Sequence, residues 1–387
     1  MSFNFTTPIP LSLYIHLPWC VKKCPYCDFN SYALRDDLPE QAYVDALLAD
    51  LEQELPKIWG RRLESIFLGG GTPSLFSPEA IDRLLSGVRR LLPARPDIEI
   101  TLEANPGTFE QTKFSEFRSA GINRLSIGIQ SFNPEHLKVL GRIHDDKEAK
   151  LAAEVAHRAG FENFNLDLMF GLPGQRIESS QLDLQTAIDL KPTHISFYQL
   201  TLEPNTEFHV HPPQLPDDES IWQMQLEGQG LLASTGYQQY EISAYARPHQ
   251  QCHHNLNYWE FGDYIGIGAG AHGKITDPAS STISRYWKPR QPQQYLDQAS
   301  SNPTENLRHL SEKEAIFEFM LNALRLTNGF SADLFSERTG LPWETASKLC
   351  ESSIADSLLQ KNNRLIQPTT LGRRFLDNLT GRFLPDD

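Results

Sequence analysis

The stretch YIHLPWCVKKCPYCDFNSY, residues Tyr14–Tyr32, places three of the chain's five cysteines within eight residues. Cys20, Cys24 and Cys27 form a C-x3-C-x2-C pattern that follows Leu11–Leu17, an apolar run typical of a buried strand. Three thiols at this spacing can belong to a disulfide framework, to most of a zinc site, or to a four-iron cluster with one iron left open. The rest of the sequence decides between these alternatives.

The composition is that of an ordinary globular protein. Hydrophobic residues make up 40% of the 387 residues and the formal net charge is −14, so no nucleic-acid partner is expected. No apolar run reaches the roughly 20 residues that span a bilayer, and the first residues lack the pattern of a signal peptide. A cytoplasmic location is therefore expected, where thiols stay reduced. The odd number of cysteines, five, also argues against a disulfide framework.

Short apolar runs alternate with helical patterns over the first half of the chain. The runs are Leu11–Leu17, Glu64–Leu68, Ile98–Glu103, Arg124–Gln130, Asn163–Met169 and His194–Leu200. Near-continuous apolar character is typical of parallel strands that are covered on both faces. Ser77 and Pro78 mark a helix start, and Gly121 and Gly160 mark helix ends. Six consecutive βα units predict an α/β fold with a partial (β/α)6 barrel, and a doubly wound open sheet is the alternative.

Three regions are predicted along the chain. Residues 1–204 carry the partial barrel. Residues 205–306 begin with a proline-rich loop and carry the runs YQQYEISAY and YIGIGAG, which are expected to add strands to the sheet. Residues 307–387 are expected to form a smaller, mainly helical domain that ends in a short hairpin and a helix, a winged-helix-like arrangement.

The cysteine pattern favours an iron–sulfur cluster over zinc. Zinc normally takes four protein ligands, commonly from two C-x2-C pairs, and this chain has one such pair. The other candidates, Cys252, His253 and His254, lie more than two hundred residues further on. A four-iron cluster usually takes four cysteines, so three thiolates leave one iron open to a substrate or cofactor. Lys22 and Lys23 are expected to help hold the thiols ionised.

Glycines and polar residues follow the other predicted strands at their carboxyl ends, where the ligands of a βα barrel gather. The sequence GGGTP, Gly69–Pro73, follows the second run, and glycines let the backbone approach a ligand closely. Glu103 ends the third run, Gln130 ends the fourth, and Asp167 lies in the fifth. Each alone can be a structural residue at a turn, but polar groups at all these points are costly in a dry core. Their joint placement predicts a ligand site at one mouth of the barrel.

With these motifs the sequence resembles the radical S-adenosylmethionine (radical SAM) family, and within it the coproporphyrinogen-dehydrogenase-like branch, over nearly the whole chain. The resemblance implies that Cys20, Cys24 and Cys27 hold a [4Fe-4S] cluster whose open iron binds S-adenosylmethionine (SAM). It also implies a SAM site made of Tyr14, Gly70, Gly71, Thr72, Glu103, Gln130, Arg142 and Asp167. Arg142 is expected to pair with the SAM carboxylate, and the acidic residues to accept hydrogen bonds from ribose hydroxyls or the ammonium group.

Position 29 separates two functional types within this branch. The dehydrogenases read C-x3-C-x2-C-x-C, whereas here Phe29 stands where their fourth cysteine lies. They also carry a longer segment before the cluster than the 19 residues ahead of Cys20. Both departures indicate a resemblance to the heme chaperones of the HemW type, which read C-D-F at this point. The sequence HNLNYW, His254–Trp259, matches their H-N-x-x-Y-W motif and implies heme contact at His254.

The resemblance therefore implies a chaperone that binds heme and delivers it to acceptor hemoproteins such as respiratory cytochromes, with no catalytic residue assigned. The alternatives are an oxygen-independent coproporphyrinogen III dehydrogenase and a zinc-stabilised binding protein. Cys252, His253 and His272 are weaker candidates for a heme ligand, and Cys350 is expected to be a buried thiol without a role. The sequence GAGAHG, within Gly268–Gly273, fits a dinucleotide fingerprint in spacing, but no helix is expected to follow it.

Overall fold

The structure is a computed structural model that describes residues 3–385, and its centre is a partial barrel of parallel strands. The six strands are β1 (Leu11–Leu17), β4 (Leu63–Gly70), β5 (Ala94–Ala104), β6 (Arg124–Gln130), β7 (Asn163–Phe170) and β8 (His194–Gln199). Each pairs in parallel with the next in chain order, so the sheet has no point at which the strand order reverses. The prediction of a partial (β/α)6 barrel is confirmed, and the doubly wound alternative is wrong.

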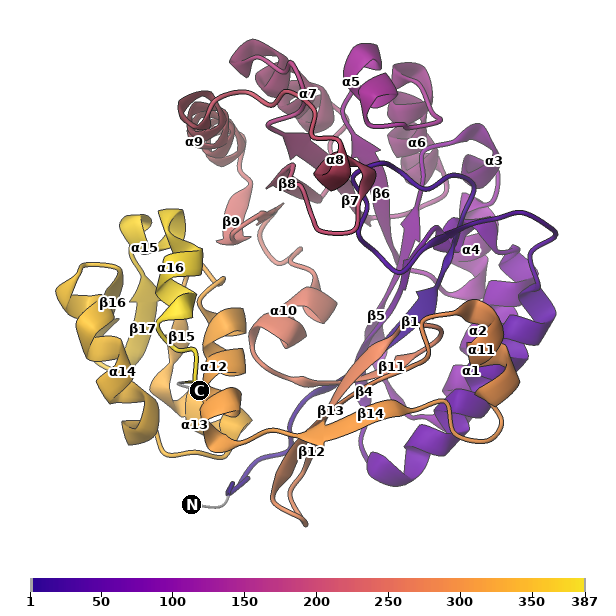
Figure 1. Cartoon of the computed structure of the whole chain (residues 1–387). Coiled ribbons are helices and arrows are strands. Elements are labelled where there is room, and N and C mark those ends of the chain that lie inside the picture. The colour runs from indigo at the N-terminus through magenta and orange to yellow at the C-terminus, as the bar shows by residue number, and fades with distance from the viewer. Residues whose placement is uncertain (1–2, 386–387) are drawn as a thin grey trace.

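Helices cover the outer face of these strands, as Figure 1 shows. They are α1 (Glu40–Glu54), α2 (Pro78–Leu91), α3 (Thr108–Gln111), α4 (Phe114–Ala120), α5 (Pro134–Val139), α6 (Asp146–Arg158) and α7 (Ile177–Asp189), with short 3-10 turns at Leu55–Lys57 and Pro73–Leu75. The predicted punctuation is confirmed: the Ser77 side chain caps α2 by accepting from the amide of Ala80, and Gly121 ends α4 with φ +109°. No helix in residues 3–385 is long and apolar enough to cross a membrane.

Further strands extend the sheet at both ends. β9 (Gln238–Glu241) and β10 (Ala244–Ala246) follow β8, while β11 (Asp263–Ile267), β12 (His272–Asp277), β13 (Thr282–Trp287) and β14 (Glu305–His309) extend the sheet beyond β1. The result is one sheet of twelve strands in the order β14-β13-β12-β11-β1-β4-β5-β6-β7-β8-β10-β9. Three helices, α8 (Glu207–Val210), α9 (Asp218–Ser234) and α10 (His253–Trp259), lie between β8 and β11 in the chain, and α11 (Pro292–Gln298) precedes β14. The two predicted runs of additional strands are confirmed. Because β12 rather than a helix follows Gly268–Gly273, the dinucleotide interpretation of that motif is excluded.

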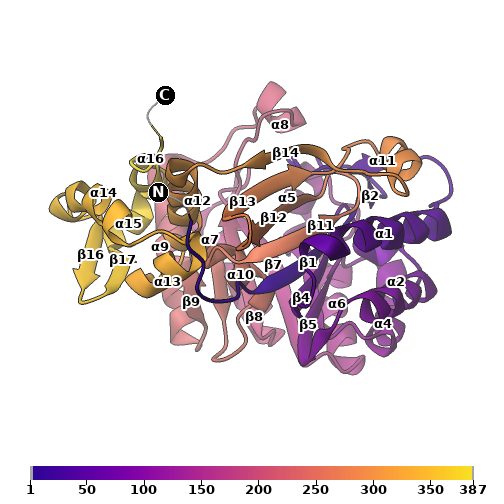
Figure 2. The same cartoon turned by 90° about the horizontal axis from the view of Figure 1, so that it is seen from below.

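The C-terminal part packs as a unit with its own hydrophobic core, beside the barrel (Figure 1, Figure 2). Its elements are α12 (Glu312–Ala323), β15 (Phe330–Ser331), α13 (Ala332–Thr339), α14 (Glu344–Ala355), β16 (Leu359–Asn362), β17 (Leu365–Pro368), α15 (Thr370–Arg374) and α16 (Leu376–Gly381). The N-terminal segment reaches this unit, because the amide of Asn4 donates to the carbonyl of Gly340 at 2.8 Å. The domain limits 1–204, 205–306 and 307–387 stay predictions, and β14 crosses the last of them.

Candidate cofactor and heme site

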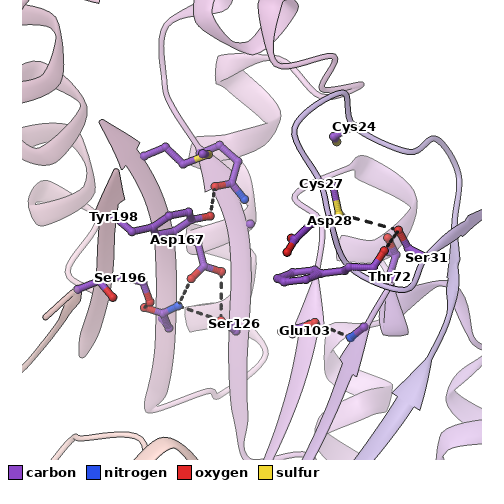
Figure 3. A pocket seen from close by; sticks show the side chains of 18 of the residues that line it. Cys24, Cys27, Asp28, Ser31, Thr72, Glu103, Ser126, Asp167, Ser196 and Tyr198 are labelled. Atoms are coloured by element: carbon purple, nitrogen blue, oxygen red, sulfur yellow. Dashed lines mark hydrogen bonds between the residues drawn. The ribbon is translucent and has the colours of Figure 1, made fainter. Parts of the chain in front are cut away.

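All twelve residues that the sequence assigned to a site line one cavity of about 740 Å³ at the mouth of the barrel. They are Tyr14, Cys20, Cys24, Cys27, Gly70, Gly71, Thr72, Glu103, Gln130, Arg142, Asp167 and His254. Figure 3 shows the cysteine loop on one side of this cavity, and Asp167 with Ser126, Ser196 and Tyr198 on the other. The two sides come from segments about a hundred or more residues apart in the chain, which the barrel brings together.

The cysteine loop is held between two short strands, β2 (Trp19–Cys20) and β3 (Tyr32–Ala33), which pair in parallel. The amide of Cys27 donates to the carbonyl of Cys24 at 3.2 Å, and the Cys27 Sγ lies 3.9 Å from the Ser31 Oγ. All three thiols are free and partly buried. The loop therefore presents three cysteines from one compact turn.

Lys23 acts at Cys27 in the expected direction, because its charge lowers the pKa of that thiol, but burial is the larger effect. Burial raises the pKa of both Cys20 and Cys27 above the usual value, and for Cys27 the opposing charge of Lys23 is a smaller effect. The Lys23 Nζ also donates to the carbonyls of Phe29 and Ser31 at 3.1 and 3.2 Å, so it holds the loop in shape. A metal ion bound to these thiols would favour their thiolate forms.

Within residues 3–385, no group of three or more His, Cys, Asp or Glu side chains is arranged to hold one metal ion. Structural zinc normally takes four protein ligands, and the loop supplies three cysteines. A four-iron cluster with one open iron takes three thiolates.

The GGGTP turn brings the backbone of β4 against the start of the cysteine loop. The amides of Gly71 and Thr72 donate to the carbonyls of Leu17 and Trp19 at 2.8 and 2.7 Å. A Cβ at residue 71 would lie 2.5 Å from the Trp19 carbonyl oxygen, a clash that this backbone atom cannot move away to relieve. Gly70 has φ +117°, a backbone conformation that favours glycine. The glycines therefore allow a close approach that any other residue would prevent, and they leave the cavity wall open at this point.

Two carboxyl groups face the cavity with raised pKa values. Burial and the nearby charge of Asp167 raise the pKa of Glu103 to about 7, although the Gly70 amide donates to its Oε2 at 3.0 Å. Burial also raises the pKa of Asp167, against hydrogen bonds from Asn165 at 2.7 Å and Ser126 at 3.2 Å. A cationic or hydroxyl-bearing ligand between them would favour their ionised forms.

The free energy of unfolding of the cofactor-free protein is expected to depend on pH through Glu103. The pKa of Glu103, about 7, lies above the ordinary value of 4.5. The protonated side chain therefore contributes its whole stabilisation below pH 4.5, and this contribution is lost as the pH rises to 7. Glu103→Gln removes this loss. At pH 8 the variant should be more stable than wild type by about 1–3 kcal/mol, after allowance for solvent in the cavity.

Urea unfolding at pH 4.5 and pH 8 measures this difference, which should nearly vanish at the lower pH. Glu116→Gln, at an exposed position of α4, is the matched control and should show no difference at either pH. A Glu103→Gln difference that is the same at both pH values would contradict the assignment.

Gln130 and Arg142 are fixed by neighbours that the sequence did not single out. The Tyr198 hydroxyl donates to the Gln130 Oε1 at 2.7 Å. Arg142 donates to the Asn105 Oδ1 and to the Gly128 carbonyl, both at 2.7 Å, and its Nη1 lies 3.7 Å from the Cys24 Sγ. Asn105 follows Glu103 by two residues at the same strand end, and this position could have marked it as a site residue in the sequence. Tyr198 lies within an apolar run and gave none.

His254 is a neutral imidazole with one nitrogen free. Burial, and then the charge of Arg124, lowers the pKa of His254 to about 3. The His254 Nδ1 lies 2.9 Å from the Ser65 Oγ, which is paired with the Ser12 Oγ at 2.8 Å. With the proton on Nδ1, His254 donates to Ser65 and the Nε2 keeps its lone pair. The Nε2 is buried with no hydrogen-bond partner in residues 3–385. Such an atom suits a metal ligand or an acceptor for a bound molecule.

The weaker candidates lie elsewhere. Cys252 is fully buried outside the cavity lining, its Sγ is 3.5 Å from the Glu99 Oε1, and burial raises its pKa to about 12. His253 is exposed at the start of α10, and His272 lines a neighbouring cavity. Cys350 is buried in α14, as predicted.

Comparison with known proteins agrees with the fold described above. The family model described as the Radical SAM superfamily matches residues 14–182, and the HemN C-terminal domain matches residues 310–375. The chain is 49% identical to the heme chaperone HemW of Escherichia coli (strain K12) over 377 residues, which cover 97% of this chain and 99% of that one. It is 32% identical to the heme chaperone HemW of Bacillus subtilis (strain 168), with 96% and 99% covered.

Among solved structures, the chain is similar to coproporphyrinogen III oxidase (HemN) from Escherichia coli, which is described as a radical SAM enzyme. The TM-score is 0.81 at 25% identity, and the match covers 97% of this chain and 90% of that one. The fold, the cysteine loop and the C-terminal unit thus agree with sequence similarity along the whole chain. The protein belongs to the HemW family of the radical SAM superfamily.

Proposed function

We propose that this protein is a heme chaperone that binds heme and delivers it to acceptor hemoproteins such as respiratory cytochromes. The observation that carries the proposal is the identity of 49% with a heme chaperone over nearly the full length of both chains. Phe29 supports it, because the side chain at this position is an exposed aromatic ring, 59% accessible, on the cavity wall. The dehydrogenases that the sequence resembles carry a thiol there.

The radical SAM family implies a [4Fe-4S] cluster and SAM, and the cavity suits both. We assign Cys20, Cys24 and Cys27 to three irons, and the open iron to SAM. The Arg142 Nε is buried and has no hydrogen-bond partner in residues 3–385, so a donor remains for an anionic ligand. A bound cluster supplies electrons, which enzymes of the superfamily use to cleave SAM. The SAM residues assigned are Tyr14, Gly70, Gly71, Thr72, Glu103, Gln130, Arg142 and Asp167.

Heme contact is assigned to the α10 region. His254 lines the cavity, its Nε2 is buried without a hydrogen-bond partner in residues 3–385, and neutral imidazole nitrogen is a common ligand of heme iron. Tyr258, one turn further along α10, packs edge-on against the His254 ring with centroids 4.8 Å apart, which fixes the imidazole orientation.

One specific observation favours a second function. The fold matches coproporphyrinogen III oxidase (HemN) with a TM-score of 0.81, so oxidative decarboxylation of coproporphyrinogen III is the rival activity. Fold similarity alone does not assign that activity, because one scaffold hosts many functions.

A single anaerobic experiment distinguishes the two functions. Protein reconstituted with iron and sulfide is given coproporphyrinogen III with SAM and a reductant, and in parallel is given heme followed by an apo-cytochrome. We expect stable heme binding and transfer to the apo-cytochrome, without decarboxylated product. Decarboxylation without heme transfer would reject the chaperone in favour of the dehydrogenase, and zinc retention without iron–sulfur absorbance would reject both.

A further inference from the structure

A second cavity of about 620 Å³ adjoins the first at the cysteine loop. The two cavities share Tyr14, Gly70, Glu103 and Tyr258, together with the loop residues Asp28 and Phe29. The remaining wall of the second cavity comes from β1, from Asn30 of the cysteine loop, from the stretch β11 to β13 and from the segment that follows β13. No residue of that remaining wall belongs to the predicted SAM site, so a ligand distinct from SAM can occupy this space.

The second cavity is lined by aromatic rings that are partly open to solvent. His272 on β12 lies opposite Trp287 on β13, and the two rings stack with centroids 5.9 Å apart. Tyr258 and Tyr264 pack edge-to-face at 4.4 Å. With Phe29 they form a wall of broad, rigid, amphipathic surfaces, which is the usual lining for a flat and largely apolar ligand.

Arg290 gives this cavity a free positive charge. Its side chain is exposed, lines the second cavity only, and has no hydrogen bond or ion pair within residues 3–385. Its backbone is fixed to the cysteine loop, because its carbonyl accepts from the Asn30 Nδ2 at 2.9 Å and from the Tyr32 hydroxyl at 3.0 Å. In a chain of net charge −14, an unpaired arginine beside an aromatic wall points to an anionic group on the ligand.

The charges also indicate an orientation. The acidic side chains of this cavity, Asp28 and Glu103, both lie in the wall shared with the first cavity, whereas Arg290 lies outside that shared wall. A planar macrocycle with carboxylates on one edge would therefore place that edge toward Arg290 and away from the acidic pair. Heme has this shape and charge, with two propionate groups on one edge.

We propose that the second cavity holds the carboxylate edge of heme, with Arg290 pairing a propionate and Trp287 packing against the macrocycle. This inference rests on the proposed heme-binding function and deepens it. It assigns the affinity for the macrocycle to β12, β13 and the residues after them, rather than to α10 alone. The exposure of Arg290 also leaves the propionates near solvent, where an acceptor protein can reach them.

The test compares heme with its dimethyl ester, which lacks both carboxylates, in titrations of the cluster-loaded protein followed at the Soret absorbance. Wild type should bind heme about tenfold more tightly than the ester, since a charge-assisted pair is lost. Arg290→Gln should abolish this preference. Trp287→Ala should weaken both ligands by a similar factor and keep the preference. Arg62→Gln, at an exposed arginine just before β4 and outside both cavities, is the control and should behave as wild type.

The ratio of the two affinities is the deciding quantity, because a general loss of stability would lower both affinities together. Equal affinity of wild type for heme and ester, or a preference that survives in Arg290→Gln, would overturn the assignment of Arg290. If wild type binds neither ligand, the proposed function itself fails, and this outcome is distinct from failure of the inference.

Discussion

Cys24→Ser is expected to abolish assembly of the four-iron cluster. A serine hydroxyl stays protonated where a thiol is deprotonated by iron. A four-iron cluster held by three cysteines already has one iron without a protein ligand, so it cannot lose another. Cys24 sits in the middle of the loop, with the Arg142 Nη1 3.7 Å from its Sγ. After anaerobic reconstitution, iron content and the broad visible absorbance of the cluster should fall to background in the variant.

Cys350→Ala is the matched control, because this thiol is buried in α14, far along the chain from the loop. It should assemble the cluster as wild type does. Normal iron content and absorbance in Cys24→Ser would contradict the assignment of the ligands. A bound zinc ion in place of iron, in wild type as well as in the control, would instead revive the zinc-stabilised alternative.

Much of the barrel could be predicted because its strands are signalled locally. All six apolar runs became parallel strands, and two of them, Leu11–Leu17 and Arg124–Gln130, have the predicted limits. Burial on both faces makes such strands continuously apolar, which short-range pattern reading detects. The strand-end residues of the site, such as Glu103, Gln130 and Asp167, followed from topology, because the carboxyl ends of consecutive parallel strands lie at the same mouth of the barrel. Tyr14 and Arg142 were assigned through the family resemblance. His254 was found only through resemblance to a family motif, since nothing in its local sequence distinguishes it from a packed histidine.

The second cavity could not be predicted, and the reason is also physical. Its wall joins Phe29, at one end of the chain, to Trp287 and Arg290 near the other end, through antiparallel strands added beside β1. β12 buries the polar side chains of Lys274 and Thr276, and β13 mixes polar with apolar residues, so both lack the continuous apolar run of the central strands. That burial outweighs the charge of Lys23 at Cys27 could not be predicted for a related reason, because burial of the thiols is a tertiary effect that sequence proximity of charges does not reveal.

Lys288→Met is expected to destabilise the protein by about 3–5 kcal/mol, since breaking a buried ion pair leaves unpaired buried charge. Lys288 is fully buried, and its Nζ donates to Asp50 at 2.6 Å and to Glu54 at 2.8 Å, both on α1. Without the ammonium, two carboxylates would remain in the core. Burial raises the pKa of Asp50, so protonation of Asp50 at low pH removes part of the penalty, and the loss should be larger at pH 8 than at pH 5. Urea unfolding at the two pH values measures this effect.

Lys57→Met is the matched control for Lys288→Met, because Lys57 pairs with the same Glu54 at 2.9 Å but has a side chain that is 39% exposed. Because the Lys57 side of this pair is open to solvent, its loss is expected to cost only about 1 kcal/mol. Lys288 also stands directly after Trp287 and two residues before Arg290, and its amide donates to the Ala271 carbonyl at 2.8 Å. The buried pair therefore anchors the segment that carries the proposed heme contacts to α1 of the barrel. Lys288→Met should accordingly weaken heme binding even where the protein remains folded. If Lys288→Met and Lys57→Met lowered stability equally, and neither changed heme affinity, the buried pair would have no such anchoring role.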